Sequence, residues 1–228
     1  MIKLEKKESI YFLTLDAGEN RWNTTFVREI AKALDAIEDD EGQGALITSS
    51  TDSKFFSNGL DLEWMQAPED HPDGGDREVF GEEFMYLMGR FITLPIPTVC
   101  ALNGHTFGAG FMFALSHDFR IMREDKGFIC ANEMQLGLPI PRPELALFKH
   151  KIPANAFFET VQLSKRWTGA DALKAGIVQG VSSFEELSEA ALRKAKELAP
   201  LANNRKNFGH QKEMLYGENA AINLAHGP

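Results

Sequence analysis

The chain has 228 residues, 43% of them hydrophobic and 25% charged, a composition typical of one soluble globular domain with a substantial core. Its 24 Lys and Arg against 33 Asp and Glu give a formal net charge of −9, which argues against nucleic acid as a partner because phosphate binding needs a basic face. The charge does not exclude a small anionic ligand, because a few local cations and N–H groups can hold one.

The cysteines and the chain ends bear on the compartment. Cys100 and Cys130 lie in short apolar runs, which predicts buried, reduced thiols rather than a disulfide or a metal site. The N-terminal MIKLEKKESIYF lacks the apolar core of a secretory signal, and no apolar run is long enough to span a bilayer. The final LAHGP is not a peroxisomal address of the SKL type. We therefore expect a cytoplasmic protein with no membrane partner.

The N-terminal half alternates short strands and helices. Residues 10–15 predict a strand, and Asn23 or Thr24 then caps a helix with one apolar face. Glycines end that helix before a second predicted strand at 45–48. This spacing of strand, helix and strand favours an α/β layered fold.

A second set of elements follows a turn-rich segment. Residues 66–76 (QAPEDHPDGGD) predict a surface loop, either a tolerated insertion or a lid over a site. A buried strand at 98–102 then leads to the Gly-rich residues 107–110, which open a short apolar helix. Two short strands are expected at 119–122 and 127–130.

The chain from residue 154 onward predicts helices throughout, so we divide it into a core of residues 1–153 and a helical region of residues 154–228. Ser183 and Glu186 form a capping box for one of these helices. Its expected apolar face carries Phe184, Leu187, Ala191, Ala195 and Leu198. The last segment, 203–224, has Phe208, Leu215 and Ile222 at heptad-like spacing, a stripe that packs on the chain's own core or on a neighbouring subunit.

Three segments carry the chemistry together. They are FFSNGLDL (55–62), NGHTFGAG (103–110) and ANEMQLGL (131–138). Each glycine turn can present free backbone N–H groups, although alone each is more often only a turn or a packing device. The third segment places Glu133 in apolar company directly after a strand, where a raised pKa suits a general acid/base.

In combination these segments resemble the crotonase superfamily, the enoyl-CoA hydratase/isomerase family, over roughly residues 10–175. The resemblance implies an α/β fold, a crotonase-like spiral of ββα units with a C-terminal helical trimerisation region. It also implies an acyl-CoA thioester as the ligand, with coenzyme A as part of the substrate and no further cofactor or metal. A homotrimer or a hexamer is the implied assembly.

The resemblance also implies a role for each matching residue. The backbone N–H groups of Leu60 and Ala109 hold the thioester oxygen, and Glu133 is the catalytic acid/base. The substrate-binding residues are Phe56, Ser57, Asn58, Gly59, Leu60 and Asp61, whose backbone lines coenzyme A, with Ala109, Met112 and Asn132 near the acyl group.

One departure from the family pattern separates two reactions. Hydratases of this family use a second glutamate two residues beyond the position of Gly110, where this chain has Met112. A thioether transfers no proton, so the pattern favours a Δ3,Δ2-enoyl-CoA isomerase with a single glutamate. We expect a dry apolar pocket that includes Met112, Met134, Leu136 and Phe128. Hydration, thioester hydrolysis and a non-catalytic acyl-CoA-binding paralogue are the alternatives.

Several further residues have weaker signals. His105 is expected to be structural or to face solvent, and Asp118 to hold a turn or an ion pair. Arg21, Lys54 and Lys212 are candidates for the phosphates of coenzyme A.

Overall fold

The structure is a computed structural model that describes residues 1–68 and 76–216. Its strands are β1 (Ile2–Lys7), β2 (Ile10–Leu15), β3 (Ala45–Ser50), β4 (Phe55–Ser57), β5 (Thr98–Leu102), β6 (His105–Phe107), β7 (Phe119–Arg123), β8 (Ile129–Cys130) and β9 (Gly180–Ser182). Its helices are α1 (Thr24–Glu38), α2 (Leu62–Gln66), α3 (Phe80–Thr93), α4 (Ala109–Leu115), α5 (Arg142–Lys151), α6 (Ala154–Val161), α7 (Gly169–Lys174), α8 (Phe184–Leu198) and α9 (Arg205–Tyr216), with 3-10 helices η1 (Glu133–Leu136) and η2 (Ala199–Ala202).

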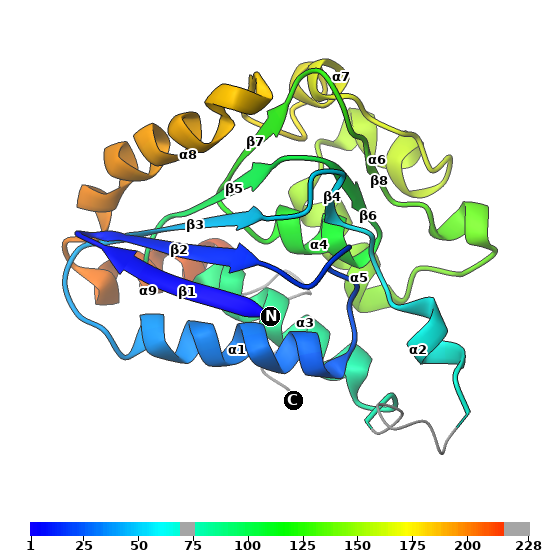
Figure 1. Cartoon of the computed structure of the whole chain (residues 1–228), viewed down its shortest axis with the longest axis horizontal. Coiled ribbons are helices and arrows are strands. Elements are labelled where there is room, and N and C mark those ends of the chain that lie inside the picture. The colour runs from blue at the N-terminus through cyan, green and yellow to red at the C-terminus, as the bar shows by residue number, and fades with distance from the viewer. Residues whose placement is uncertain (69–75, 217–228) are drawn as a thin grey trace.

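Two sheets run through the molecule (Figure 1). The larger has the order β1-β2-β3-β5-β7-β9, in which β1 is antiparallel to β2 and the other neighbours are parallel. The smaller sheet is parallel, with the order β4-β6-β8. Strand pairs β3 and β4, β5 and β6, and β7 and β8 each give one strand to each sheet before a helix follows. The repeat is the spiral of ββα units expected from the sequence.

The central strands of the large sheet are buried on both faces. Ile47, Val99 and Ile121 point to a layer formed with α8, whose Leu187 and Ala191 pack against them. Alternate residues on the same strands point the other way, because side chains of a strand alternate between its two faces. These residues, Leu46, Cys100, Leu102 and Met122, join the main core with α1 and α3. Figure 1 shows α8 on one side of the sheet and α1 with α3 on the other.

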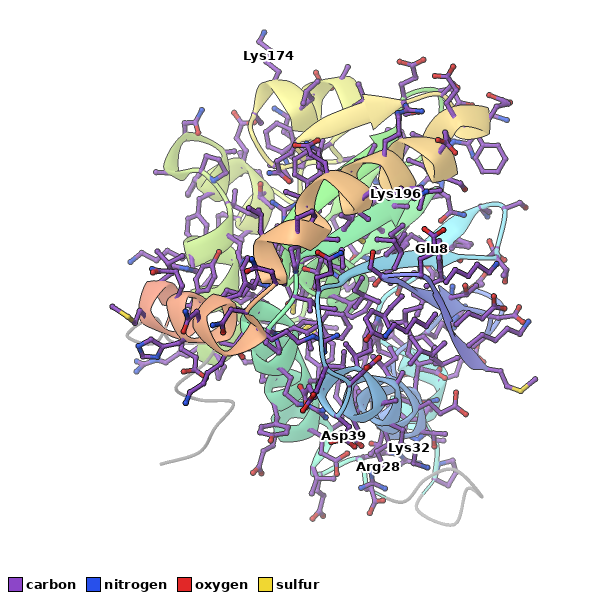
Figure 2. All side chains as sticks on the ribbon, turned by 90° about the vertical axis from the view of Figure 1, so that its left-hand side faces the viewer. Glu8, Arg28, Lys32, Asp39, Lys174 and Lys196 are labelled. Atoms are coloured by element: carbon purple, nitrogen blue, oxygen red, sulfur yellow. The ribbon has the colours of Figure 1, made fainter. Side chains whose placement is uncertain are left out.

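Two of the predicted helices begin at the N-cap residues that the sequence indicates. Asn23 accepts a hydrogen bond from the N–H of Phe26 at 2.9 Å and so caps α1. Ser183 accepts one from the N–H of Glu186 at 3.3 Å and caps α8. Figure 2 shows Arg28 and Lys32 on the outer side of α1, away from the core.

The prediction that residues 154–228 are entirely helical is wrong. β9 lies in this region and pairs in parallel with β7, and α8 covers the sheet of the other region. The two regions therefore share one sheet, and the division at residue 153 stays a prediction. Within the capped helix, Phe184 is exposed although it was expected on the apolar face. Ile222 and most of the expected 66–76 loop lie outside the described residues.

Other expectations concern cysteines, membranes and metals. Cys100 and Cys130 are free and buried, as predicted. Along residues 1–68 and 76–216, no helix is long and apolar enough to cross a membrane. The same residues contain no group of three or more His, Cys, Asp or Glu side chains placed to hold a metal ion.

Candidate active site

Two glycine turns lie against each other at the carboxyl ends of β4 and β6. Gly59 has a φ of +83°, and a Cβ added to it would lie 2.9 Å from the carbonyl oxygen of Phe107. Gly108 has a φ of +48° and a ψ of −117°, a conformation that L side chains rarely adopt. Both turns therefore need glycine, for the backbone angles and for the close approach of the two chains.

Each turn presents one N–H group that local structure leaves unused. Trp22 and Leu60 form a parallel bridge whose hydrogen bonds use the N–H groups of Trp22 and Asp61, at 2.9 Å each. Because N–H directions alternate along an extended chain, the N–H of Leu60 points to the opposite side. Ala109 is the first residue of α4, and the first N–H groups of a helix have no acceptor within it.

Hydrogen bonds and close packing fix the position of β4, which leads into the first of these turns. The Ser57 hydroxyl accepts a hydrogen bond from the Trp22 indole at 3.0 Å and donates one to the carbonyl of Asn20 at 2.7 Å. A Cβ on Gly110 would lie 2.5 Å from the Ser57 side chain, so α4 packs directly on β4. Ser57 and Phe56 are fully buried, and their side chains belong to the packing that holds the turns in place.

Glu133 lies beside the second turn. It begins η1, three residues after the end of β8, and its Oε1 is 3.1 Å from the point where a Cβ of Gly108 would stand. The Asn132 side-chain oxygen is 3.6 Å from the same point. Oε2 of Glu133 is buried without a hydrogen-bond partner among the described residues. Burial raises the pKa of Glu133, as its apolar sequence context predicts.

A cavity of about 550 Å³ joins these groups. Of the predicted site residues it is lined by Asn58, Gly59, Leu60, Ala109, Met112, Asn132 and Glu133. Its apolar wall comes from Leu62, Met65, Phe80, Phe84, Leu136 and Leu138.

Some predicted neighbours lie elsewhere. Met134 is exposed, and Phe128 packs on the His105 ring, so neither is part of the wall expected of them. Asp61 caps α2 by accepting a hydrogen bond from the N–H of Trp64 at 3.1 Å. It faces an adjoining hollow, of which Arg21 is also a part.

The remaining candidates with weak sequence signals have different surroundings in the structure. Lys212 is buried and donates to Asp118 at 2.7 Å and to the Ile96 carbonyl at 3.2 Å, so its assignment to coenzyme A phosphates is wrong. The same ion pair confirms the expectation for Asp118. Arg21 lines the main cavity as well as the adjoining hollow.

His105 and Lys54 lie at the amino ends of β6 and β4, away from the glycine turns, and the N–H of His105 donates to the Lys54 carbonyl oxygen at 2.8 Å. The His105 ring packs among Phe55, Phe107 and Phe128, which fits the expected structural role. The Lys54 ammonium lies 4.8 Å from the centre of the Phe55 ring.

Glu144 is a cavity residue that the sequence analysis misses. It lies in the first turn of α5 and lines the same cavity as Glu133. Burial, with a further contribution from the charge of Glu133, raises the pKa of Glu144 to about 7. The sequence around it carries no signal that separates it from an exposed residue in the first turn of a helix.

The ββα spiral, the paired glycine turns and the buried glutamate together define a crotonase-type protein. Residues 5–216 match the model of the enoyl-CoA hydratase/isomerase family, and the chain belongs to that family.

Individual relatives carry several activities in their names. Enoyl-CoA delta isomerase 2, peroxisomal, of Arabidopsis thaliana is 32% identical, covering 97% of this chain and 95% of its own length. Carnitinyl-CoA dehydratase of Salmonella typhi is 33% identical over 74% of this chain and 63% of its own length. The crystal structure of human mitochondrial delta3-delta2-enoyl-CoA isomerase superposes with a TM-score of 0.84 at 24% identity, over 96% of this chain and 84% of that one. This last likeness supports the crotonase fold.

Proposed function

We propose that the protein is an enoyl-CoA isomerase that moves a double bond from position 3 to position 2 of an acyl-CoA thioester. The observation that carries the proposal is the Glu133 carboxyl group, buried beside the Gly108 turn and open to an apolar cavity. Near-full-length relatives that are named enoyl-CoA delta isomerases support it.

The two turn N–H groups supply the electrostatic part of the mechanism. Loss of a proton from carbon 2 puts negative charge on the thioester oxygen, and the N–H groups of Leu60 and Ala109 donate to that oxygen. Their turns are held by glycine backbone angles and by packing, so little reorganisation accompanies the reaction. One such donor typically contributes about 3 kcal/mol to lowering the barrier.

Glu133 supplies the proton transfer. Its carboxylate takes the proton from carbon 2, and a single carboxylate can complete the shift by returning a proton at carbon 4. A raised pKa makes it a stronger base than an exposed glutamate, which suits removal of a carbon-bound proton. A proton shift leaves the overall oxidation state of the substrate unchanged and so requires no redox cofactor, and the two N–H groups polarise the thioester without a metal.

Met112 favours isomerisation over hydration. It is buried on α4 and lines the cavity at the position where hydratases of this family carry a second glutamate. A thioether neither orients nor deprotonates water, and the surrounding wall is apolar. The acyl chain then occupies a dry site beside the Leu60 turn, and the backbone from Phe56 to Asp61 approaches coenzyme A.

Hydration is the second candidate function. The carnitinyl-CoA dehydratase relative shows that water chemistry occurs among similar proteins, and Glu144 brings a second carboxyl group into the cavity. The relative rates on 2-enoyl-CoA and 3-enoyl-CoA thioesters separate the two functions.

Replacing Glu133 by Gln tests the proposal. Gln keeps the size of the side chain and removes the transferable proton, so the variant is expected to bind acyl-CoA normally and to lose isomerase turnover at least 100-fold. Calorimetric binding and a spectrophotometric isomerase assay measure the two effects. Turnover close to that of the wild type would eliminate Glu133 as the base.

Assembly and compartment are parts of the same proposal. We expect trimers, alone or paired into hexamers, as the family resemblance implies. A cytoplasmic location is likewise a prediction, and the name of the Arabidopsis relative above places that protein in the peroxisome.

A further inference from the structure

Glu144 enters the cavity from a different wall than Glu133. The chain leaves η1 through Gly137, at a φ of +72°, and continues through Leu138, Pro139 and Pro141 into α5. α5 then returns along α4, so Glu144 in its first turn lines the cavity that Glu133 and Met112 also line. The two carboxyl groups are eleven positions apart in sequence and face one space.

Neither Glu133 nor Glu144 forms an ion pair among the described residues, although two arginines line the same cavity. Arg21 and Arg77 are the cations of the cavity lining. Arg21 pairs with Glu19 at 2.8 Å, and Arg77 donates to the carbonyl oxygens of Ala67 and Pro68. Oε2 of Glu133 has no hydrogen-bond partner in the described part of the chain.

A carboxyl group that is largely removed from water and lies near a second carboxylate favours its protonated form. The burial of Glu144 and its interaction with the Glu133 charge act in that direction. The first turn of a helix by itself favours the charged form, so the burial of Glu144 opposes and outweighs the local helix field.

A 1,3-proton shift removes a proton at one carbon and adds a proton at another, and two separate carboxyl groups can divide these steps. This cavity provides both groups when Glu133 is ionised and Glu144 is protonated. Met112 occupies the position on α4 where a second acid/base residue would face the cavity. The second carboxyl group of this cavity comes from α5 instead.

We propose that Glu144 is a second acid/base residue of this cavity, which delivers the proton to carbon 4 while Glu133 removes the proton from carbon 2. The C2–H bond breaks as Glu133 takes the proton, and the electrons delocalise over the thioester as a dienolate. Glu144 then gives its proton to carbon 4, a C4–H bond forms, and the double bond lies between carbons 2 and 3. Proton transfer from Glu133 to Glu144 restores the starting state. The inference rests on the proposed isomerase function and replaces its single-carboxylate route.

Glu144→Gln separates the two proton transfers. In D₂O with a 3-enoyl-CoA thioester, mass spectrometry follows deuterium at carbon 2 of recovered substrate, and absorbance follows the conjugated product. The expected result is a fall of about 10²-fold in product formation while exchange at carbon 2 continues within a few-fold of the wild type. Equal losses of exchange and product formation, or no loss of either, would overturn the inference.

A second measurement needs no variant. If Glu144 must be protonated to act, product formation by the wild type falls as the pH rises through about 7, while exchange at carbon 2 persists. A product rate that follows exchange at every pH contradicts the inference.

Glu185→Gln, an exposed change on α8, controls for the loss of one negative charge. It is expected to leave exchange and product formation unchanged. A wild type that neither exchanges nor isomerises 3-enoyl-CoA would refute the proposed function itself. Full isomerisation by Glu144→Gln would refute only the role of Glu144, as would a selective loss of hydration of 2-enoyl-CoA.

Discussion

Burial of Glu144 makes the stability of the folded chain depend on pH near neutrality. Its pKa rises from 4.5 to about 7 on folding, so the folded state holds the proton more tightly than the unfolded state. The unfolded state loses its proton first, and the folded chain therefore becomes less stable as the pH rises from about 4.5 to 7.

Glu144→Gln removes this dependence. At pH 8 the variant is expected to be more stable than the wild type, by about 3 kcal/mol at most, while at pH 4 the two should be nearly equal. Urea unfolding at both pH values measures the difference. A variant that is less stable than the wild type at pH 8 would show that Glu144 has a stabilising partner in the folded state.

Sequence context identifies one of the two carboxyl groups. Glu133 follows a predicted strand within ANEMQLGL, and its neighbours alone indicate burial. Glu144 lies in PRPELAL, where nothing local distinguishes a cavity residue from an exposed residue in the first turn of a helix. Its position depends on the path of α5 back along α4, which is a tertiary property.

At the scale of elements, the sequence predicts the two glycine turns of the site but does not predict that they contact each other. Glycines at 59 and 108 indicate free backbone N–H groups, but the approach of Gly59 to Phe107 depends on the parallel pairing of β4 with β6. The pairing is a property of the whole fold, and no local pattern contains it.

Gly108→Ala tests whether turn geometry controls the chemistry. The added Cβ would contact Glu133 Oε1 at 3.1 Å, and the backbone would leave its present angles. We expect isomerase turnover to fall at least 10²-fold, because the Ala109 donor and the Glu133 carboxyl both shift. Gly42→Ala is the matched control, since Gly42 also has a positive φ, +86°, but has open space around it. Similar turnover losses in both variants would mean that general destabilisation, and not site geometry, explains the effect.

The elements that the sequence analysis misses differ in how visible they are in the sequence. β1 reads IKLEKK, a mostly exposed edge strand whose charges obscure its alternation. β9 has three residues including a glycine, too few to show a period, and it forms only because β7 offers an open edge. α3 is also absent from the predicted elements, although eight of its residues are buried.

At the scale of the whole molecule, the C-terminal helices bury only part of their apolar surface in the chain's own core. α8 packs on the large sheet, and in the stripe predicted at 203–224 Phe208 packs on the main core while Leu215 is exposed. Other large apolar side chains of this region are exposed as well, among them Phe158, Leu163, Leu201 and Met214. Such side chains are compatible with burial between subunits.

The oligomeric state therefore stays a prediction that needs its own measurement. Light scattering at micromolar concentration is expected to give a mass close to three or six times the 25.4 kDa of one chain. A stable monomer would contradict the expected assembly.

The central claim is that this cavity isomerises enoyl-CoA and does not primarily hydrate it. The most direct test is the ratio of wild-type rates on 3-enoyl-CoA and 2-enoyl-CoA thioesters of equal chain length, with the double-bond position and the added water both followed. Because Met112 supplies no acid/base group, isomerisation is expected to exceed hydration by about 10²-fold or more. Hydration that equals or exceeds isomerisation would contradict the account, and would mean that another group, such as Glu144, activates water in this site.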